Sequence, residues 1–234
     1  MSSDNTPAVG AIKFGDLRRL TPIGADYGFE RGRPIDRFYI EDKFLSPNCS
    51  CIKGAVLEVA ESTYTRRFGE GRVTQSDVLH APPGNANANI VEDITNAETI
   101  SSNYYDCVIF TQTLLLVFDY QAAIKTLFRI LRPGGVLLAT FPGISRQLSH
   151  DATDPWPDYW RFTSLSARRL FIQTFGEGAT QVETYGNVFV AAAFLFGLAC
   201  EDLKMSELEY QDPAYEMLIT VKATKATDVH ESER

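Results

Sequence analysis

Cysteine and histidine, the common ligands of zinc, are scarce in this sequence. The 234 residues include only four cysteines and three histidines. Cys49 and Cys51 are the only two that lie close together, and a C-x-C spacing lacks the C-x-x-C pairs of a zinc site. We therefore expect no bound metal, and we expect reduced thiols, as in a cytoplasmic protein.

Long hydrophobic runs and an excess of positive charge are also missing. The longest apolar run, 188–200, is shorter than the roughly 20 residues that span a bilayer. No basic-then-apolar leader opens the chain, so we expect no signal peptide. The net charge is −8, from 22 basic and 30 acidic residues, which disfavours nucleic acid or an anionic membrane as the main partner.

The composition and length predict one globular domain with additions. Hydrophobic residues make up 44% and charged residues 22% of the chain, which argues against wholesale disorder. We expect residues 1–52 to form an amino-terminal segment that caps the site, residues 53–224 to form an α/β domain, and residues 225–234 to form a disordered tail.

Strand and helix signals alternate along the chain. Apolar and β-branched runs predict strands at 55–59, 72–75, 89–91, 105–110, 136–140, 181–185 and 218–222. Helical patterns lie between them, at 62–68, 119–132, 164–175 and 189–203, and Ser62, Asp119 and Ser164 are the expected N-caps of the first three. This alternation predicts a doubly wound, mostly parallel sheet with helices on both faces. In such a sheet, ligands bind beyond the carboxyl ends of the strands.

Acidic residues stand at the ends of three predicted strands. Glu58 and Glu61 flank the end of the first strand, Asp77 follows the second, and Asp93 follows the third. A carboxylate after the second strand can accept hydrogen bonds from both hydroxyls of a ribose. For each residue taken alone, a helix cap or a solvated loop is an equally good interpretation.

The segment around the strongest strand resembles a known family. Residues 105–110 (Tyr-Asp-Cys-Val-Ile-Phe), then Leu115, then 131–137 (Leu-Arg-Pro-Gly-Gly-Val-Leu) resemble class I S-adenosylmethionine-dependent methyltransferases. The resemblance covers about residues 53–142. It implies a Rossmann-like, seven-stranded-type sheet, methyl transfer of the EC 2.1.1 type, and S-adenosyl-L-methionine as cofactor.

A narrower resemblance lies outside that core. Residues 14–20, 31–41 and 159–163 look like a bacterial methyltransferase-like subgroup that is linked to sugar, polysaccharide or natural-product pathways. This likeness suggests a small-molecule acceptor.

The family resemblance also implies a set of cofactor-binding positions. These are Arg37, Tyr39, Glu58, Ala60, Glu61, Asp77, Val78, Asp93, Ile94, Thr111 and Gln112. The first turn would lie under the methionine part, Asp77 would hold the ribose, Asp93 would meet the adenine, and Thr111 would lie beside the sulfonium. Arg37 and Tyr39, with the amino-terminal segment folded over the site, would contact the cofactor carboxylate or the substrate. For Arg37, a surface ion pair with Asp36, Glu41 or another acid is at least as well supported.

Two features depart from the family pattern. The family's first turn carries glycines, because the backbone must approach the ligand closely, whereas residues 58–64 read Glu-Val-Ala-Glu-Ser-Thr-Tyr. The Cβ of Ala60 narrows the cleft there, and Glu61 either binds the amine of the cofactor or excludes the cofactor. The loop 80–89 replaces the usual helix after the second strand, which opens the adenine side.

Transfer to a hydroxyl needs a proton acceptor, for which histidine is the usual choice near neutral pH. His150, with Asp151 as its orienting partner, is the candidate, because it lies in the loop after the fifth strand. An exposed loop histidine is the competing interpretation. Trp156, Tyr159 and Trp160 are candidate substrate-binding aromatics, although they could equally form a hydrophobic lid.

The sequence therefore leaves three functions open. The first is O-methylation of a hydroxyl on a small molecule, sugar or natural product. The second is a non-catalytic binding or scaffold protein of the same fold, and the third is another reaction on this fold, such as a cyclisation. A nicotinamide dehydrogenase is disfavoured because no G-x-G-x-x-G follows the first strand. A homodimer through the apolar stretch 189–198 is possible.

Overall fold

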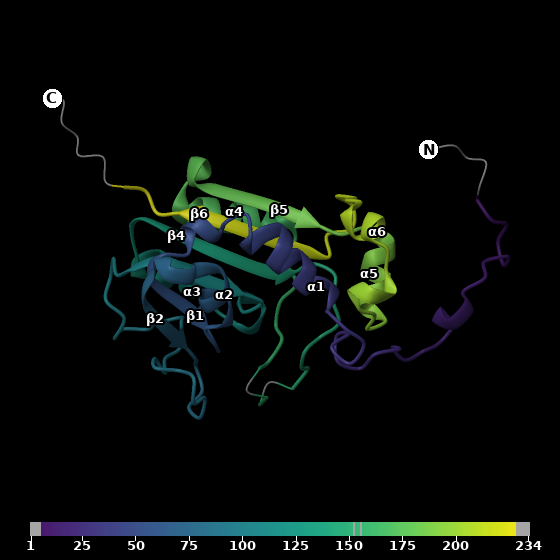
Figure 1. Cartoon of the computed structure of the whole chain (residues 1–234), viewed down its shortest axis with the longest axis horizontal. Coiled ribbons are helices and arrows are strands. Elements are labelled where there is room, and N and C mark those ends of the chain that lie inside the picture. Colours follow the sequence, from purple (N-terminus) through teal and green to yellow (C-terminus); the bar gives the residue numbers. More distant parts are fainter. Residues whose placement is uncertain (1–5, 152, 155, 228–234) are drawn as a thin grey trace.

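A single six-stranded sheet forms the centre of the computed structural model, which describes residues 6–151, 153–154 and 156–227. The strand order is β2-β1-β3-β4-β6-β5 (Figure 1). The parallel strands are β1 (Gly54–Val59), β2 (Val73–Leu79), β3 (Tyr105–Thr111) and β4 (Leu131–Pro142). Both β4 and β5 (Thr180–Tyr185) pair antiparallel with β6 (Leu218–Thr224). The predicted doubly wound, mostly parallel sheet is confirmed.

Helices cover both faces of this sheet (Figure 1). One face carries α3 (Tyr120–Ile130) and α4 (Ser164–Phe175). The other carries α1 (Ile35–Phe38), its π-helical continuation (Tyr39–Leu45), α2 (Thr63–Gly69), α5 (Val188–Leu195) and α6 (Met205–Glu209).

The central strand β3 shows why apolar runs were a good guide to the sheet. Cys107 and Ile109 pack into the core on one face, whereas Val108 and Phe110 pack into the core on the other. A strand that is buried on both faces needs apolar residues at every position and not only at alternate ones. Helix α3 also begins as predicted, because the Asp119 side chain accepts a hydrogen bond from the amide of Ala122 at 2.9 Å.

Three predicted elements differ in the structure. The third strand, expected from residue 89, is reduced to an isolated bridge between Leu79 and Ile90. The cap of α4 is Thr163 and not Ser164. The apolar helix expected over 189–203 ends at Leu195, because Gly197 has φ +71° and lies against the Gly24 carbonyl, where a side chain would not fit.

The two ends of the chain differ in how they meet the core. Residues 35–52 of the expected cap contribute buried side chains to the same core as the sheet. Lys225, expected to begin the tail, instead donates to the carbonyls of Phe128 and Leu131, so order extends past β6. Residues 1–5 and 228–234 of the predicted cap and tail lie outside the described residues.

Two further observations concern the helices. None of those in the described ranges is long and apolar enough to cross a bilayer. Helix α5 leaves Val188, Phe189 and Leu195 exposed; the expected homodimer stays a prediction.

Candidate functional site

A cavity lies where the strand order of the sheet reverses. The chain passes from β1 to β2 on one side and then returns to β3 on the other side of β1. At the carboxyl ends of these strands the cavity has two parts. We call the part of about 580 Å³ the first lobe, and the part of about 480 Å³ the second lobe. Both lie within the roughly 300–1,000 Å³ that is typical of small-molecule sites.

The two lobes are neighbours with a common wall. Val59, Thr113, Leu116 and Trp156 line both of them. Val59 ends β1 and Thr113 follows β3, so the wall stands at the switch point itself. A ligand that extends across this wall would therefore contact both strands, which is where ligands bind in doubly wound sheets.

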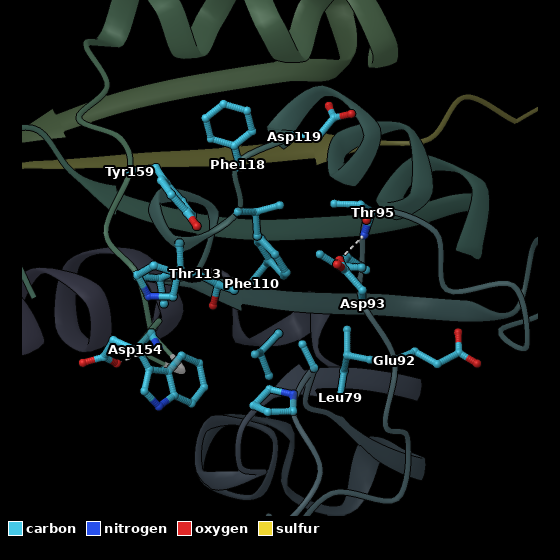
Figure 2. A pocket seen from close by; sticks show the side chains of 18 residues that line it. Leu79, Glu92, Asp93, Thr95, Phe110, Thr113, Phe118, Asp119, Asp154 and Tyr159 are labelled. Carbon is cyan, nitrogen blue, oxygen red and sulfur yellow. Dashed lines mark hydrogen bonds between the residues drawn. The ribbon is translucent and has the colours of Figure 1, made fainter. Parts of the chain in front are cut away.

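The first lobe is mainly apolar, with polar groups at its margin. Phe118 and Tyr159 lie on one side and Asp93 and Thr95 on the other, while Glu92 extends away from the centre (Figure 2). The rings of Phe118 and Tyr159 meet edge to face at 5.3 Å. Asp93 accepts a hydrogen bond from the Thr95 amide at 2.9 Å. Such walls suit a flat heterocycle with a hydrogen-bonding edge.

The second lobe holds more charged side chains than the first, and the amino-terminal segment forms part of its wall. Its walls include Asp36 and Arg37, which lie in α1, and Arg146 from the loop after β4. Arg37 Nη1 donates to the Tyr64 hydroxyl at 2.9 Å, in place of the surface ion pair that was the competing interpretation. Burial raises the pKa of Tyr64 to about 12, so its hydroxyl stays protonated at neutral pH.

Glu58 holds the turn between β1 and α2. Its side chain is only 3% exposed, and its carboxylate accepts hydrogen bonds from the Tyr64 amide at 3.0 Å and from the Thr65 amide and hydroxyl at 2.7 Å each. Burial raises the pKa of Glu58 by more than these hydrogen bonds lower it, so the pKa lies above its ordinary value. Glu58 thus caps α2, a role for which Ser62 was expected.

The backbone adopts the left-handed conformation at the ends of both central strands. Ala60, directly after β1, has φ +68°, and Gln112, directly after β3, has φ +50°. Both residues line the second lobe. Their amides are fixed, because Ala60 donates to the Leu79 carbonyl at 2.9 Å and Gln112 to the Thr140 carbonyl at 2.7 Å. Ala60 therefore adopts the conformation for which the family's turn uses glycine.

The structure brings most of the predicted site residues together. The first lobe contains Asp93, Ile94, Trp156 and Tyr159. The second lobe contains Arg37, Glu58, Ala60, Glu61, Thr111, Gln112 and again Trp156.

Other predicted site residues lie elsewhere. Tyr39 is fully buried, donates to the Leu208 carbonyl at 2.8 Å and stacks on Tyr185. Val78 is a buried strand residue beside the cavity but not in its wall. Trp160 donates from its indole nitrogen to the Val117 carbonyl at 3.1 Å and packs on the core. These residues support the site without lining it.

Asp77 is also turned away from the cavity. It lies within β2 and not at its end, and it is 6% exposed. Its Oδ1 accepts from the side-chain amides of Gln75 at 2.7 Å and Asn89 at 2.6 Å, and its Oδ2 accepts from the Tyr105 hydroxyl at 3.0 Å. Since both oxygens are occupied, the structure does not support a role for Asp77 as the ribose acceptor.

This environment predicts that Asp77 matters for stability. Asp77→Ala should lower the free energy of unfolding by about 2–4 kcal/mol, because hydrogen bonds to a charged group contribute roughly 1.5–3 kcal/mol each and buried partners would be left unpaired. Tyr105→Phe, which removes one of these bonds, should cost about 1–2 kcal/mol. Urea unfolding measures both. A nucleoside-ligand affinity that collapses in folded Asp77→Ala, with unchanged stability, would contradict this assignment.

The predicted catalytic pair is not at the cavity. His150 and Asp151 are both exposed, and neither lines a lobe. The Asp151 carboxylate accepts from the Thr153 amide at 2.8 Å and the Thr153 hydroxyl at 2.7 Å, and these bonds lower its pKa. The pair forms a surface turn, so we do not retain it as the catalytic base and its partner.

Several cavity residues were not singled out from the sequence. Asp36, Tyr27 and Arg146 line the second lobe, and Phe118 and Asp119 line the first. Phe118 and Asp119 follow the β3 strand closely in sequence, so strand-end reasoning could have found them. The other three come from segments that only the tertiary fold brings to the sheet edge.

Comparisons with known proteins agree with this architecture. Residues 50–139 match a family model described as a methyltransferase domain. Among curated proteins, a probable polyketide synthase 9/36 of Dictyostelium discoideum is 24% identical over 121 residues, or 51% of this chain and 4% of that protein. A probable polyketide synthase 5 of the same organism is 26% identical over 43% of this chain and 4% of that protein. The chain thus spans a small fraction of these relatives.

Solved structures share the fold at low sequence identity. Phosphoethanolamine N-methyltransferase 2 of Haemonchus contortus, in complex with S-adenosyl-L-methionine, has a TM-score of 0.52 at 14% identity, covering 92% of this chain and 55% of that one. A complex of the Haloferax volcanii Trm112 methyltransferase activator with a methyltransferase has a TM-score of 0.51 at 14% identity. The match covers 81% of this chain and 91% of that one. Residues 50–139 thus match the methyltransferase domain family, and the chain has the fold of S-adenosylmethionine-dependent methyltransferases.

Proposed function

We propose that this chain is an S-adenosylmethionine-dependent methyltransferase that methylates a hydroxyl of a small molecule, such as a sugar or natural product. The observation that carries the proposal is the two-lobed cavity at the reversal of strand order, where the ends of β1, β2 and β3 that line it belong to the segment that matches a methyltransferase domain. Its two lobes suit the two unlike ends of one cofactor, an apolar heterocycle and a charged amino acid.

The cofactor would extend across the common wall. Its adenine would lie in the first lobe, against Ile94 and near the Asp93 carboxylate, and its methionine part would lie in the second lobe over Ala60. Thr111 and Gln112, at the end of β3, would stand beside the sulfonium. Ala60 supports this fit, because its left-handed backbone keeps the turn that glycine makes in the family.

When bound, S-adenosylmethionine supplies an electrophilic methyl group. The residues of this chain have to hold the acceptor in line with it, at roughly 3–3.5 Å. The second lobe provides the Tyr27 ring, which carries the Arg146 guanidinium 3.9 Å from its centre, and the exposed Glu61 carboxylate. With His150 outside the cavity, Glu61 is the group that would accept the hydroxyl proton.

Tryptophan fluorescence offers a direct test, because the chain has only two tryptophans and one of them lines both lobes. Addition of S-adenosylhomocysteine should change the emission of the wild type and of Trp160→Phe. The change should be lost in Trp156→Phe, whose remaining indole lies outside both lobes. Trp160→Phe is the matched control.

The catalytic half of the proposal is tested separately. Methyl-labelled S-adenosylmethionine, incubated with a panel of hydroxyl compounds, should give labelled product. No binding of S-adenosylhomocysteine at millimolar concentration would overturn the proposal and favour a non-catalytic binding protein. Binding without transfer to any acceptor would favour another reaction on the same fold, such as a cyclisation.

A further inference from the structure

The walls of the second lobe come from two parts of the fold. The ends of β1 and β3 with α1 and α2 form the first part, beside the proposed place of the methionine end of the cofactor. Residues 26–29, the loop after β4, α5 and the start of β6 form the second part. Its side chains include six that we call the acceptor wall: Tyr27, Phe29, Arg146, Phe194, Met217 and Leu218.

Arg146 is the cation of the acceptor wall. Its guanidinium carbon lies 3.9 Å from the centre of the Tyr27 ring, and among the described residues the guanidinium makes no ion pair or hydrogen bond. Arg161, which donates to the Arg146 carbonyl at 2.6 Å, takes the carboxylate of Asp158, at 2.5 and 2.8 Å. Since Arg146 is also exposed, its N–H donors remain for a ligand.

Tyr27 supports this guanidinium from a strained backbone conformation. Its φ of +51° lies in the left-handed region, which a bulky residue rarely adopts. The next residue, Gly28, lies against the Leu198 carbonyl, where a side chain would not fit, and the Tyr27 ring packs on Phe194 with centroids 6.1 Å apart. Strained residues that their surroundings hold in place cluster at ligand sites. The stack of Arg146 on Tyr27 therefore has the character of a ligand contact.

The rest of the acceptor wall is apolar. Met217 and Leu218 are at most 1% exposed, and Phe194 is 7% exposed. An apolar surface beside one guanidinium suits a molecule that combines an apolar body with an anionic group.

The charge of the cofactor favours the same kind of acceptor. S-adenosylmethionine carries a net positive charge, which attracts an anion and repels a cation in the adjoining part of the lobe. The exposed carboxylate of Asp26 would suit a cationic acceptor instead. Preference for a cation is therefore an outcome that the test has to distinguish.

We infer that the acceptor carries an anionic group, a carboxylate or a phosphate, which binds Arg146 while its apolar body lies against Phe194 and Met217. The inference rests on the proposed function and narrows it to negatively charged hydroxyl compounds. In the transfer, the bond from methyl carbon to sulfur breaks, a bond from that carbon to the hydroxyl oxygen forms, and the hydroxyl proton passes to Glu61. The anionic group takes no part in this step. Tyr27 is a positioning residue, because it acts through Arg146.

Matched pairs of hydroxyl compounds test the inference. Hydroxybenzoate, hydroxyoctanoate and glucuronate provide an aromatic, a fatty and a sugar skeleton, and each is compared with its methyl ester. Hydroxyphenyl phosphate and tyramine add a phosphate and a cation. Titration calorimetry with the complex of the wild type and S-adenosylhomocysteine should show at least one anionic probe binding about tenfold more tightly than its uncharged partner. Comparison of hydroxyphenyl phosphate with hydroxybenzoate shows which anion the site takes.

Substitutions assign the preference to the stacked pair. Arg146→Gln should weaken the anionic probe about tenfold and leave the ester unchanged within about twofold. In methyl-transfer assays the loss should appear in KM rather than in kcat, because the charge contact is equal in the ground state and the transition state. Tyr27→Leu removes the ring and should weaken the anionic probe about threefold, whereas Tyr27→Phe keeps the ring and should match the wild type. Arg169→Gln, which removes an exposed arginine of α4 outside both lobes, is the matched control.

The outcomes separate this inference from the proposed function. Equal or tighter binding of the esters or of tyramine by the wild type would overturn the inference and leave the proposed function standing. Equal loss of acid and ester in Arg146→Gln would do the same, because the arginine would then only shape the wall. Binding of S-adenosylhomocysteine without binding of any anionic probe would also overturn the inference alone. Failure of the wild type to bind S-adenosylhomocysteine would overturn the proposed function and this inference with it.

Discussion

Glu58→Ala is expected to destabilise the protein by about 3 kcal/mol and to abolish binding in the second lobe. The substitution leaves the Tyr64 and Thr65 amides and the Thr65 hydroxyl without an acceptor in a buried place, and each unsatisfied buried group costs roughly 1–3 kcal/mol. For a chain of this length, such a loss lowers the melting temperature by roughly 6–12 °C. Thermal melting and urea unfolding measure it.

Binding should be lost because the turn that Glu58 holds is the floor of the site. Without the carboxylate, the first turn of α2 loses its acceptor, and Glu61 and Tyr64, which line the second lobe, are no longer held in place. Glu58→Gln, which keeps one acceptor oxygen, should lose about half as much stability and retain some affinity. A fully stable Glu58→Ala with normal S-adenosylhomocysteine binding would show that the turn is held by other contacts.

The pH dependence of this effect has a definite sign. The pKa of Glu58 is raised in the folded state, so the folded protein holds this proton to higher pH than the unfolded chain. The contribution of Glu58 to the free energy of unfolding therefore falls as pH rises from the ordinary carboxyl pKa through the raised one. The stability difference between the wild type and Glu58→Gln should decrease over that interval.

Ala60→Val is expected to weaken the binding of S-adenosylhomocysteine by at least about tenfold. This is the second of the two largest expected effects. A β-branched residue at φ +68° is strained by roughly 1–3 kcal/mol, and its added methyl groups occupy the wall of the second lobe. The strain either distorts the turn, which lowers ligand affinity, or lowers the stability of the protein. Calorimetric titration measures the affinity, and thermal melting of the same variant measures the stability.

Ala60→Gly is the matched variant in the opposite direction. The substitution removes the strain of an alanine in the left-handed conformation, which stabilises the folded state by roughly 1–2 kcal/mol. It also increases the conformational entropy of the unfolded chain, which destabilises the folded state by roughly 0.4–1 kcal/mol. Stability should therefore change little, and S-adenosylhomocysteine affinity should be equal or higher. Tighter binding to Ala60→Val than to Ala60→Gly would show that the lobe does not hold the ligand over this turn.

The sequence was most informative where one segment alone determines its structure. The apolar run of β3 predicted a strand buried on both faces, and Asp119 with the stripe of α3 predicted a helix start, because propensity and hydrophobic burial act over neighbouring residues. The polar residues at the ends of β1 and β3, such as Glu61 and Gln112, were likewise found from order along the chain, since parallel strands bring their carboxyl ends to one edge.

The roles of individual side chains required the tertiary structure. Asp77 and Glu58 are both acids near strand ends, yet Asp77 is satisfied inside the sheet by Gln75, Asn89 and Tyr105, whereas Glu58 caps α2. Which way a strand residue faces depends on register with its neighbours, and a shift of one residue reverses it. His150 lies outside the cavity for a related reason, because the path of a loop depends on distant contacts.

What the sequence by itself determined is the architecture: a wound α/β sheet with its ligand edge at the ends of β1 and β3. What only the tertiary structure decided is which charged side chains reach that edge and which are held by hydrogen bonds elsewhere. Asp36 and Arg37 reach the second lobe because α1 packs across the sheet. Pairing between charged groups depends on distances across the fold, and order along the chain does not contain those distances.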